Sequence, residues 1–125
     1  MILVDVEMME RGAIMPDGVI QKVRVAAMSA VGARYLAPEK PKVLGLFGSG
    51  WQASAHLEFL AAQYRFDQIK VFSPNQEHCR EFCRSMSEKL GREVRSVATP
   101  KEAVNGSASV QPPTAAWAPC RQARF

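Results

Sequence analysis

The stretch from Val43 to Leu60, VLGLFGSGWQASAHLEFL, carries the residues whose spacing points most directly to chemistry. Gly48, Gly50 and Ala53 fit the pattern Gly-x-Gly-x-x-Gly/Ala directly after an apolar run. In that pattern the first glycine permits a tight turn, the second lets the backbone approach a pyrophosphate, and the small third residue lets a helix pack close to a sheet. The free N–H groups at the start of that helix would face the anion. The spacing therefore predicts a dinucleotide site.

The end of the next predicted strand bears on which dinucleotide would bind. A carboxylate that grips the adenosine ribose usually stands about twenty residues beyond the glycines, but this chain has Ser73, Pro74 and Asn75 there. Because no carboxylate is present to repel a 2′-phosphate, NADP is slightly favoured over NAD, with the Ser73 hydroxyl and the Asn75 amide as candidate contacts. The candidate cofactor-binding residues are Gly48, Ser49, Gly50, Trp51, Gln52, Ala53, Ser73 and Asn75.

Other interpretations of these residues remain open. A strand-to-helix bend can contain glycines without binding a ligand, and a methyltransferase holds its adenosyl ligand with a related glycine loop. Ser73 also has a second explanation, because Ser73, Pro74 and Gln76 form a capping box that would start a helix. The position of the glycines between a predicted strand and a predicted helix favours the dinucleotide.

Strands and helices must position these residues, and the apolar pattern predicts both. Apolar residues at three- and four-residue intervals predict a helix over 20–36, and the continuous apolar run 42–48 predicts a strand buried on both faces. The elements expected after it are a helix following the glycines, a strand over 68–72, a helix over 73–90, a strand over 93–97 and a short helix capped by Thr99. This alternation predicts an α/β fold, a partial Rossmann-like doubly wound parallel sheet preceded by a strand and a long helix.

The two ends of the chain are predicted to differ from this alternating part. Residues 2–8 alternate apolar and polar types as in a half-buried strand, and residues 11–18 supply the Gly and Pro-Asp-Gly of turns. Residues 107–125 contain prolines, no periodicity and no run that predicts a fourth strand, so an irregular tail is expected. Three parallel strands alone would leave an open apolar edge.

Composition argues against several classes of protein. Arg121 and Arg124 contribute two units to the net charge of +4, and elsewhere the basic residues are spread singly among acids, a pattern that does not favour nucleic-acid binding. No apolar run approaches the roughly 18 residues of a membrane span and no signal peptide is recognised, so a cytoplasmic location without membrane contact is expected. Cys79 and Cys83 are predicted to be core thiols, and no metal site is expected. His56 and His78 are taken as packing or surface residues.

The segment KVRVAAMSAVGARYLAPEKPKVLGLFGSGWQASAHLEFL, residues 22–60, resembles the ornithine cyclodeaminase and mu-crystallin family. That family carries an Arg-Thr-Ala-Ala segment on a long helix, followed by a strand and a Gly-x-Gly-x-Gln-Ala turn. The residues that match in order and spacing are Arg24, Ala26, Ala27, Tyr35, Leu36, Ala37, Gly48, Gly50, Gln52 and Ala53. Over its whole extent the resemblance runs from about residue 10 to 106.

The resemblance implies NAD(P)-dependent hydride transfer at the amine-bearing carbon of an amino acid or cyclic imine. The reaction would be the deamination of ornithine to proline, or imine reduction or amino-acid oxidation. Arg24 inherits the catalytic role of holding the substrate carboxylate, which a guanidinium does through a bidentate pair. Val25 departs from the family threonine, which leaves the substrate type open. Full-length members are expected to be homodimers.

Family members are more than twice this length, so the resemblance also implies a fragment. Residues 1–19 are expected to be a remnant of the N-terminal substrate and dimerisation domain, and 20–106 a partial NAD(P)-binding domain with its leading helix. Residues 107–125 do not resemble the family strand expected there, and are interpreted as a non-native tail. Two alternatives remain, a non-catalytic crystallin-like NAD(P)-binding protein and an inactive truncated product.

Overall fold

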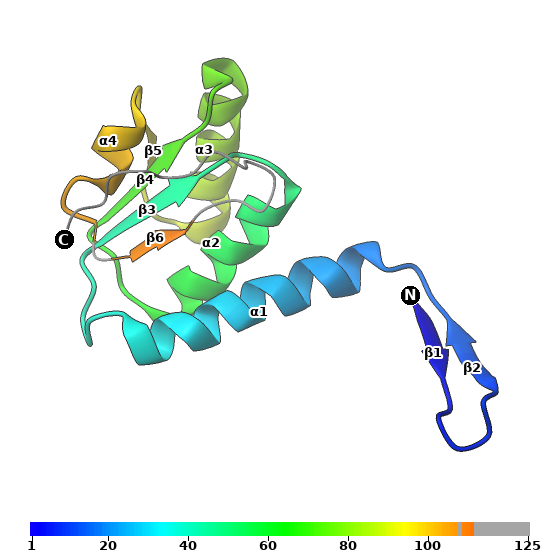
Figure 1. Ribbon diagram of the computed structural model, residues 1–125. Coiled ribbons are helices and arrows are strands. Elements are labelled where there is room, and N and C mark those ends of the chain that lie inside the picture. The colour runs from blue at the N-terminus through cyan, green and yellow to red at the C-terminus, as the bar shows by residue number, and fades with distance from the viewer. Residues whose placement is uncertain (108, 112–125) are drawn as a thin grey trace.

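A computed structural model describes residues 1–107 and 109–111 of the chain (Figure 1). Its elements in chain order are β1 (Ile2–Val4), β2 (Arg11–Ile14), α1 (Gly18–Leu36), β3 (Val43–Phe47), α2 (Trp51–Gln63), β4 (Gln68–Phe72), α3 (Gln76–Leu90), β5 (Val94–Ser96), α4 (Pro100–Val104) and β6 (Ser109–Gln111). The alternation predicted for the middle of the chain is confirmed, and the strand over 68–72 has the predicted bounds.

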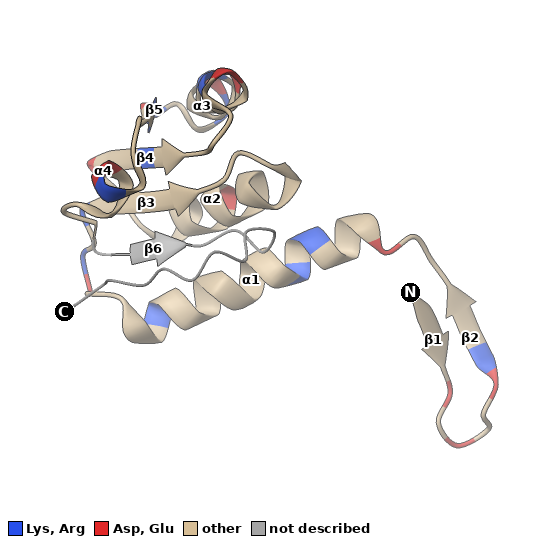
Figure 2. Cartoon of the chain, turned by 45° about the horizontal axis from the view of Figure 1, so that its top comes forward, with Lys and Arg blue, Asp and Glu red and all other residues tan. Residues whose placement is uncertain are grey.

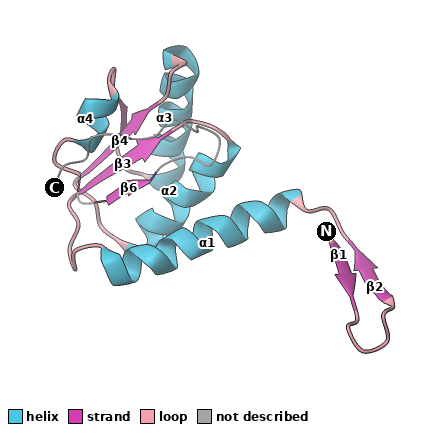
Figure 3. Ribbon diagram, viewed as in Figure 1, coloured by secondary structure: helices cyan, strands magenta, loops and turns pink. Residues whose placement is uncertain are grey.

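The main sheet has four parallel strands in the order β5-β4-β3-β6 (Figure 3). Leu44 and Leu46 of β3 face the core formed with α2 and α3. Gly45 faces the other way, because successive residues of a strand point to opposite faces, and a Cβ there would collide with the Ala103 backbone oxygen of α4. Helices therefore cover both faces of the sheet, as the doubly wound prediction requires.

The core lies between the sheet and helices α2 and α3. Its fully buried members include Leu44, Leu57, Leu60, Ile69 and Val71, each at most 2% exposed. Two thiols complete it, as predicted. Burial raises the pKa of Cys79, and burial together with the neighbouring Cys79 raises the pKa of Cys83 to about 12. Both thiols are uncharged packing groups rather than nucleophiles.

The start of α3 differs from the prediction. The helix begins at Gln76, and its cap is Asn75, whose Oδ1 accepts a hydrogen bond from the His78 N–H at 3.0 Å. Asn and Ser are equally good caps, and here the Ser73 side chain is buried at the end of β4, only 8% exposed. Gln76 Nε2 instead donates to the Ser73 and Val97 carbonyl oxygens, which ties together the ends of two strands.

The start of α4 confirms its predicted cap. Thr99 Oγ1 accepts from the Glu102 N–H at 3.2 Å, and Pro100 occupies the first helical turn. Glu102 Oε2 accepts in return from the Ala98 N–H, one residue before the cap. This reciprocal pair fixes the direction in which the chain leaves β5.

The expectation of no fourth strand is wrong. Ser109–Gln111 forms β6, which pairs in parallel with β3 in the register Leu44↔Ser109 to Leu46↔Gln111. A strand of three residues is too short for a periodic pattern, and its pairing uses backbone groups that most residue types supply. The edge of β3 that was expected to be open is therefore paired. The rest of the predicted tail, residues 112–125, lies outside the described residues.

The N-terminal residues form a hairpin that lies apart from the sheet, beyond the first turn of α1 (Figure 1). Residues 11–14, predicted as part of a turn, form β2 and pair antiparallel with β1. Asp5 Oδ1 makes the turn between them by accepting from the N–H groups of Glu7 and Met8, an Asx-type arrangement that supplies the turn without glycine. Among the residues that the structure describes, no helix is long and apolar enough to cross a membrane.

Candidate functional site

The glycine turn between β3 and α2 has the backbone that its sequence predicts. Gly48 has φ 91°, in the left-handed region that favours glycine, and its N–H donates to the Phe72 carbonyl oxygen at 2.6 Å. That bond joins the end of β3 to the end of β4. The turn therefore lies at the carboxyl edge of the parallel strands, where ligands bind in open α/β sheets.

Gly50 leaves open space beside the start of α2. It is the helix N-cap, in extended conformation, and it supplies no side chain to hydrogen-bond the first N–H groups. A Cβ built on Gly50 would meet no atom of the described residues within 4 Å. The structure therefore does not require glycine here for its own packing, whereas close approach by an anionic ligand would.

Gln52 and Ala53 follow in the first turn of α2. Ala53 is 4% exposed and packs in the core, as the small third position of the motif should. The Gln52 Oε1 atom is buried and has no hydrogen-bond partner among the described residues. A buried acceptor without a donor destabilises a fold by about 1–3 kcal/mol, so this atom is suited to receive a donor from a ligand. Backbone, open space and orphaned acceptor together fit a dinucleotide.

Ser49 makes a contact that the sequence interpretation missed. Its side chain is 6% exposed, and its Oγ lies 2.9 Å from Nδ1 of His78. His78 stands on the first turn of α3, three residues after the cap Asn75. The position of His78 in the chain could have predicted this contact, because a helix that follows β4 must start at the same sheet edge as the glycine turn.

The predicted adenosine-side contacts lie at this edge too. Ser73 is buried directly after β4, and Asn75 is exposed two residues further along the chain. The Asn75 carboxamide oxygen is already engaged as the cap of α3. The structure thus brings Ser49, Ser73, Asn75 and His78 to the ends of two adjacent strands, with Asn75 in a mainly structural position.

Trp51 joins the glycine turn to the beginning of α1. The indole is 51% exposed, and Lys22 Nζ lies 5.6 Å from its ring centroid, within the range of a cation–π interaction. A Cβ on Gly18 would contact the same ring at 3.8 Å. Figure 2 shows basic residues both in the N-terminal half of α1 and near its C-terminal end. Lys22 is the cation of α1 that lies against the turn.

Arg24 lies elsewhere on α1. It is exposed, and it stands about 160° around the helix from the fully buried Ala26, which faces α2. The structure therefore places Arg24 on the outward face of α1, away from Trp51. Its predicted role with the substrate carboxylate stays a prediction.

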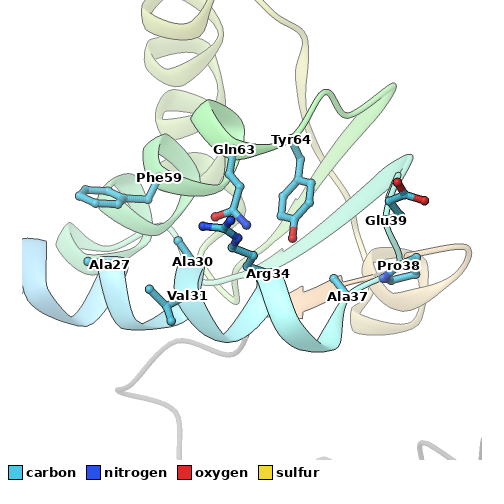
Figure 4. Close-up of a pocket in the computed structure, with 10 residues that line it drawn as sticks. All are labelled: Ala27, Ala30, Val31, Arg34, Ala37, Pro38, Glu39, Phe59, Gln63 and Tyr64. Atoms are coloured by element: carbon cyan, nitrogen blue, oxygen red, sulfur yellow. The ribbon is translucent and has the colours of Figure 1, made fainter.

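A groove of about 560 Å³ lies between the C-terminal half of α1 and the end of α2 (Figure 4). Ala30, Phe59 and Tyr64 line it, and Arg34 and Gln63 point toward one another across it. Because α2 begins at the glycine turn and ends at Gln63, this groove is at the opposite end of that helix. It is separate from the candidate dinucleotide site. Over residues 1–107 and 109–111, no group of three or more His, Cys, Asp or Glu could hold a metal ion.

Comparison with known proteins agrees with this geometry. The sequence profile of the ornithine cyclodeaminase/mu-crystallin family matches residues 1–120, a wider range than the residues 10–106 expected from the motifs. The chain belongs to this family. The family assignment and the Rossmann-like α/β fold predicted from the sequence are thereby confirmed.

Among relatives, ketimine reductase mu-crystallin of Rattus norvegicus is 32% identical over 95 residues, which are 76% of this chain and 29% of the relative. The solved Δ1-pyrroline-2-carboxylate reductase of Thermococcus litoralis, in complex with NADH and L-proline, has a TM-score of 0.82 and 29% identity, covering 89% of this chain and 34% of that one. The iminosuccinate reductase of Paracoccus denitrificans in complex with NAD⁺ also has a TM-score of 0.82, with 25% identity, covering 94% and 36%. The chain thus spans about a third of the length of these relatives.

Proposed function

We propose that this family member is the dinucleotide-binding part of an NAD(P)-dependent enzyme that transfers hydride at the amine-bearing carbon of an amino acid or cyclic imine. The observation that carries the proposal is the turn after β3, where Gly48 has a positive φ and Gly50 leaves open space at an uncapped helix start. Support comes from two similar structures, one in complex with NADH and L-proline and one with NAD⁺.

In this proposal the protein binds and orients, while the nicotinamide supplies the hydride chemistry. The first N–H groups of α2 bind the pyrophosphate, helped by the positive end of the helix dipole. Gly50 lets the backbone approach the phosphates, and Gln52 Oε1 accepts a hydrogen bond that no described residue gives it. Trp51 and Lys22 close the side of the turn that faces α1.

For the adenosine end, the preference for NADP rests on the residues after β4. No carboxylate stands among Ser73, Pro74 and Asn75 to repel a 2′-phosphate. The Asn75 oxygen caps α3, which leaves the N–H groups of its amide as the proposed donors to the phosphate, beside the Ser73 hydroxyl.

For the substrate end, Arg24 is proposed to hold a carboxylate through a bidentate pair. Its exposed position on the outward face of α1 leaves the guanidinium accessible to a ligand. We also propose, from the family resemblance, the division of the chain into residues 1–19, 20–106 and 107–125 and a homodimer for full-length relatives.

A titration of the purified chain with NADH and NADPH, followed by nicotinamide fluorescence, tests the dinucleotide proposal. Gly50→Asp places a carboxylate where the pyrophosphate is proposed to lie, and should weaken both ligands at least about tenfold. Asp is a favourable N-cap and its Cβ meets no described atom, so this variant should fold. Ala62→Asp, at an exposed position near the end of the same helix, is the matched control and should bind like the parent chain.

Circular dichroism of each variant establishes that the fold is retained. Equal binding by the parent and Gly50→Asp chains would contradict the proposal, as would a folded parent chain that binds neither dinucleotide. Turnover of L-proline or a cyclic imine would contradict the non-catalytic, crystallin-like alternative.

The Arg24 proposal is tested by adding L-proline to the complex of the chain with NADH. Arg24→Gln should weaken the effect of L-proline on nicotinamide fluorescence by about tenfold or more, because a charged carboxylate loses its partner. Arg34→Gln removes a cation from the other end of the same helix, beside the groove that is separate from the dinucleotide site, and is the matched control. Equal losses in Arg24→Gln and Arg34→Gln would contradict the Arg24 proposal.

A further inference from the structure

A side-chain contact joins Ser49 and His78, which belong to two different parts of the fold. Ser49 belongs to the glycine turn after β3, and His78 to the first turn of α3 after β4. Their side chains meet at 2.9 Å, Oγ to Nδ1. Because Ser49 is 6% exposed while His78 is exposed, the serine fixes the inner edge of the imidazole and leaves its outer edge facing solvent.

The bond leaves one ring nitrogen of His78 available. Nδ1 is engaged by the Ser49 hydroxyl, so Nε2 is the atom that can meet a ligand. If the hydroxyl donates to Nδ1, the neutral ring carries its hydrogen on Nε2, and the imidazolium carries a hydrogen on both nitrogens. In each of these states Nε2 is a donor, which suits an acceptor such as a phosphate oxygen.

The surroundings favour an anion over a neutral ribose hydroxyl. His78 lies on the first turn of α3, where helix N–H groups give partial positive charge. Ser73, with a buried side chain, lies at the same sheet edge and carries no charge. Glu77 is the one acid in the first turn of α3, and it stands about 100° around the helix from His78.

We propose that His78 is the residue that selects a 2′-phosphorylated dinucleotide, with Nε2 binding the 2′-phosphate of NADP and Ser49 orienting the ring. The proposal rests on the proposed dinucleotide function and deepens it, by naming a residue that separates NADP from NAD. It adds His78 to the contacts proposed for Ser73 and Asn75, whose amide N–H groups are not used by the cap.

The test measures the dissociation constants of NADPH and NADH for the 125-residue chain and for three variants. His78→Ala should weaken NADPH about tenfold, the size expected for one hydrogen bond to a charged group, and leave NADH within about twofold. His78→Arg places a guanidinium with several N–H donors at the same position and should recover most of the NADPH affinity. Arg84→Ala removes a cation from an exposed position about 9 Å further along α3 and should change neither ligand.

Competition with adenosine 2′,5′-bisphosphate and with 5′-AMP shows whether His78 acts on the 2′-phosphate. The bisphosphate should lose about tenfold in His78→Ala, whereas 5′-AMP should not, because only the former carries the 2′-phosphate. This readout depends on the adenosine end alone and needs no turnover.

Three results would overturn the proposal in distinguishable ways. An unchanged ratio of NADPH to NADH affinity in His78→Ala, with NADH still bound, would remove His78 and leave the dinucleotide function standing. An equal loss of both ligands would show that His78 only supports the glycine turn through Ser49. A folded parent chain that binds neither dinucleotide nor the bisphosphate would end the proposed function and this inference together.

Discussion

Apolar side chains are exposed in the N-terminal hairpin, whereas side chains of the same kinds are buried around the four-stranded sheet. Leu57 and Leu60 in the sheet region are 0% exposed, whereas Leu3 in β1 is 56% exposed and Leu36 at the end of α1 is 88% exposed. The alternation in residues 2–8 predicts a half-buried strand, yet both faces of β1 are exposed. An apolar pattern therefore indicates the surface that a segment is suited to bury, and a second layer decides whether it is buried.

Helix α1 has one buried face and one exposed face. Ala26 and Ala30 on one face are 0% and 7% exposed and pack toward α2. The outward face carries Met28 and Tyr35, each more than half exposed. The boundary between the covered and the uncovered parts of the molecule thus runs along this helix and not through a linker. Contiguous exposed apolar surface of this kind is typical of a face that binds other protein surface.

The largest expected effect compares two leucines. Leu57→Ala should lower the free energy of unfolding by about 2–5 kcal/mol, because it empties a fully buried position in the core. Leu36→Ala, at an 88% exposed position, should change it by less than about 0.5 kcal/mol. Urea unfolding followed by circular dichroism measures both. Similar losses would break the comparison, since they would require a covering layer over α1.

A second comparison uses two glycines. Gly45→Ala should destabilise by about 1–3 kcal/mol, because the new Cβ collides with the Ala103 carbonyl oxygen and the Ser107 hydroxyl of the α4 region. Gly32→Ala in α1 meets no described atom within 4 Å and should stabilise by about 0.5–1 kcal/mol, the difference in helix propensity. Opposite signs in thermal unfolding are expected. A stabilising Gly45→Ala would mean that α4 does not lie against β3.

The smallest effect concerns the start of α3. Asn75→Ala should cost about 1 kcal/mol, the usual value of an N-cap. Ser73→Ala should cost less, because its hydroxyl does not cap the helix. Denaturant midpoints of the two single variants measure this difference in stability. The result compares the free energy of a helix cap with that of a buried core side chain such as Leu57. A larger loss of stability in Ser73→Ala than in Asn75→Ala would support the capping box that the sequence predicts.

Local rules predicted the part of the fold in which each element carries its own signal. The glycine turn, β4, the Thr99 cap and the thiols Cys79 and Cys83 follow from spacing and residue type, and the structure has them as expected. These features depend on a few neighbouring residues, so a single sequence contains their cause.

The features that were missed depend on residues far apart in the chain. The strand β6 exists because β3 offers an unpaired edge, and three residues carry no period that would indicate it. The contact of Ser49 with His78 and that of Trp51 with Lys22 require knowing which helix starts meet at one sheet edge. For Asn75 and Ser73 two equally good caps compete, and the burial of Ser73 decides between them.

The pairing of β6 with β3 has a consequence for how the chain folds. Strands β3, β4 and β5 pair between segments that follow one another, whereas β6 reaches β3 only after the chain has crossed the sheet by way of α4. Contacts between distant residues are slow to form because loop closure precedes them. Until β6 docks, β3 is an unpaired apolar edge that a strand from another molecule can occupy. The docking of β6 replaces the five-residue edge of β3 with an edge strand of three residues, which offers fewer unpaired backbone groups to another molecule.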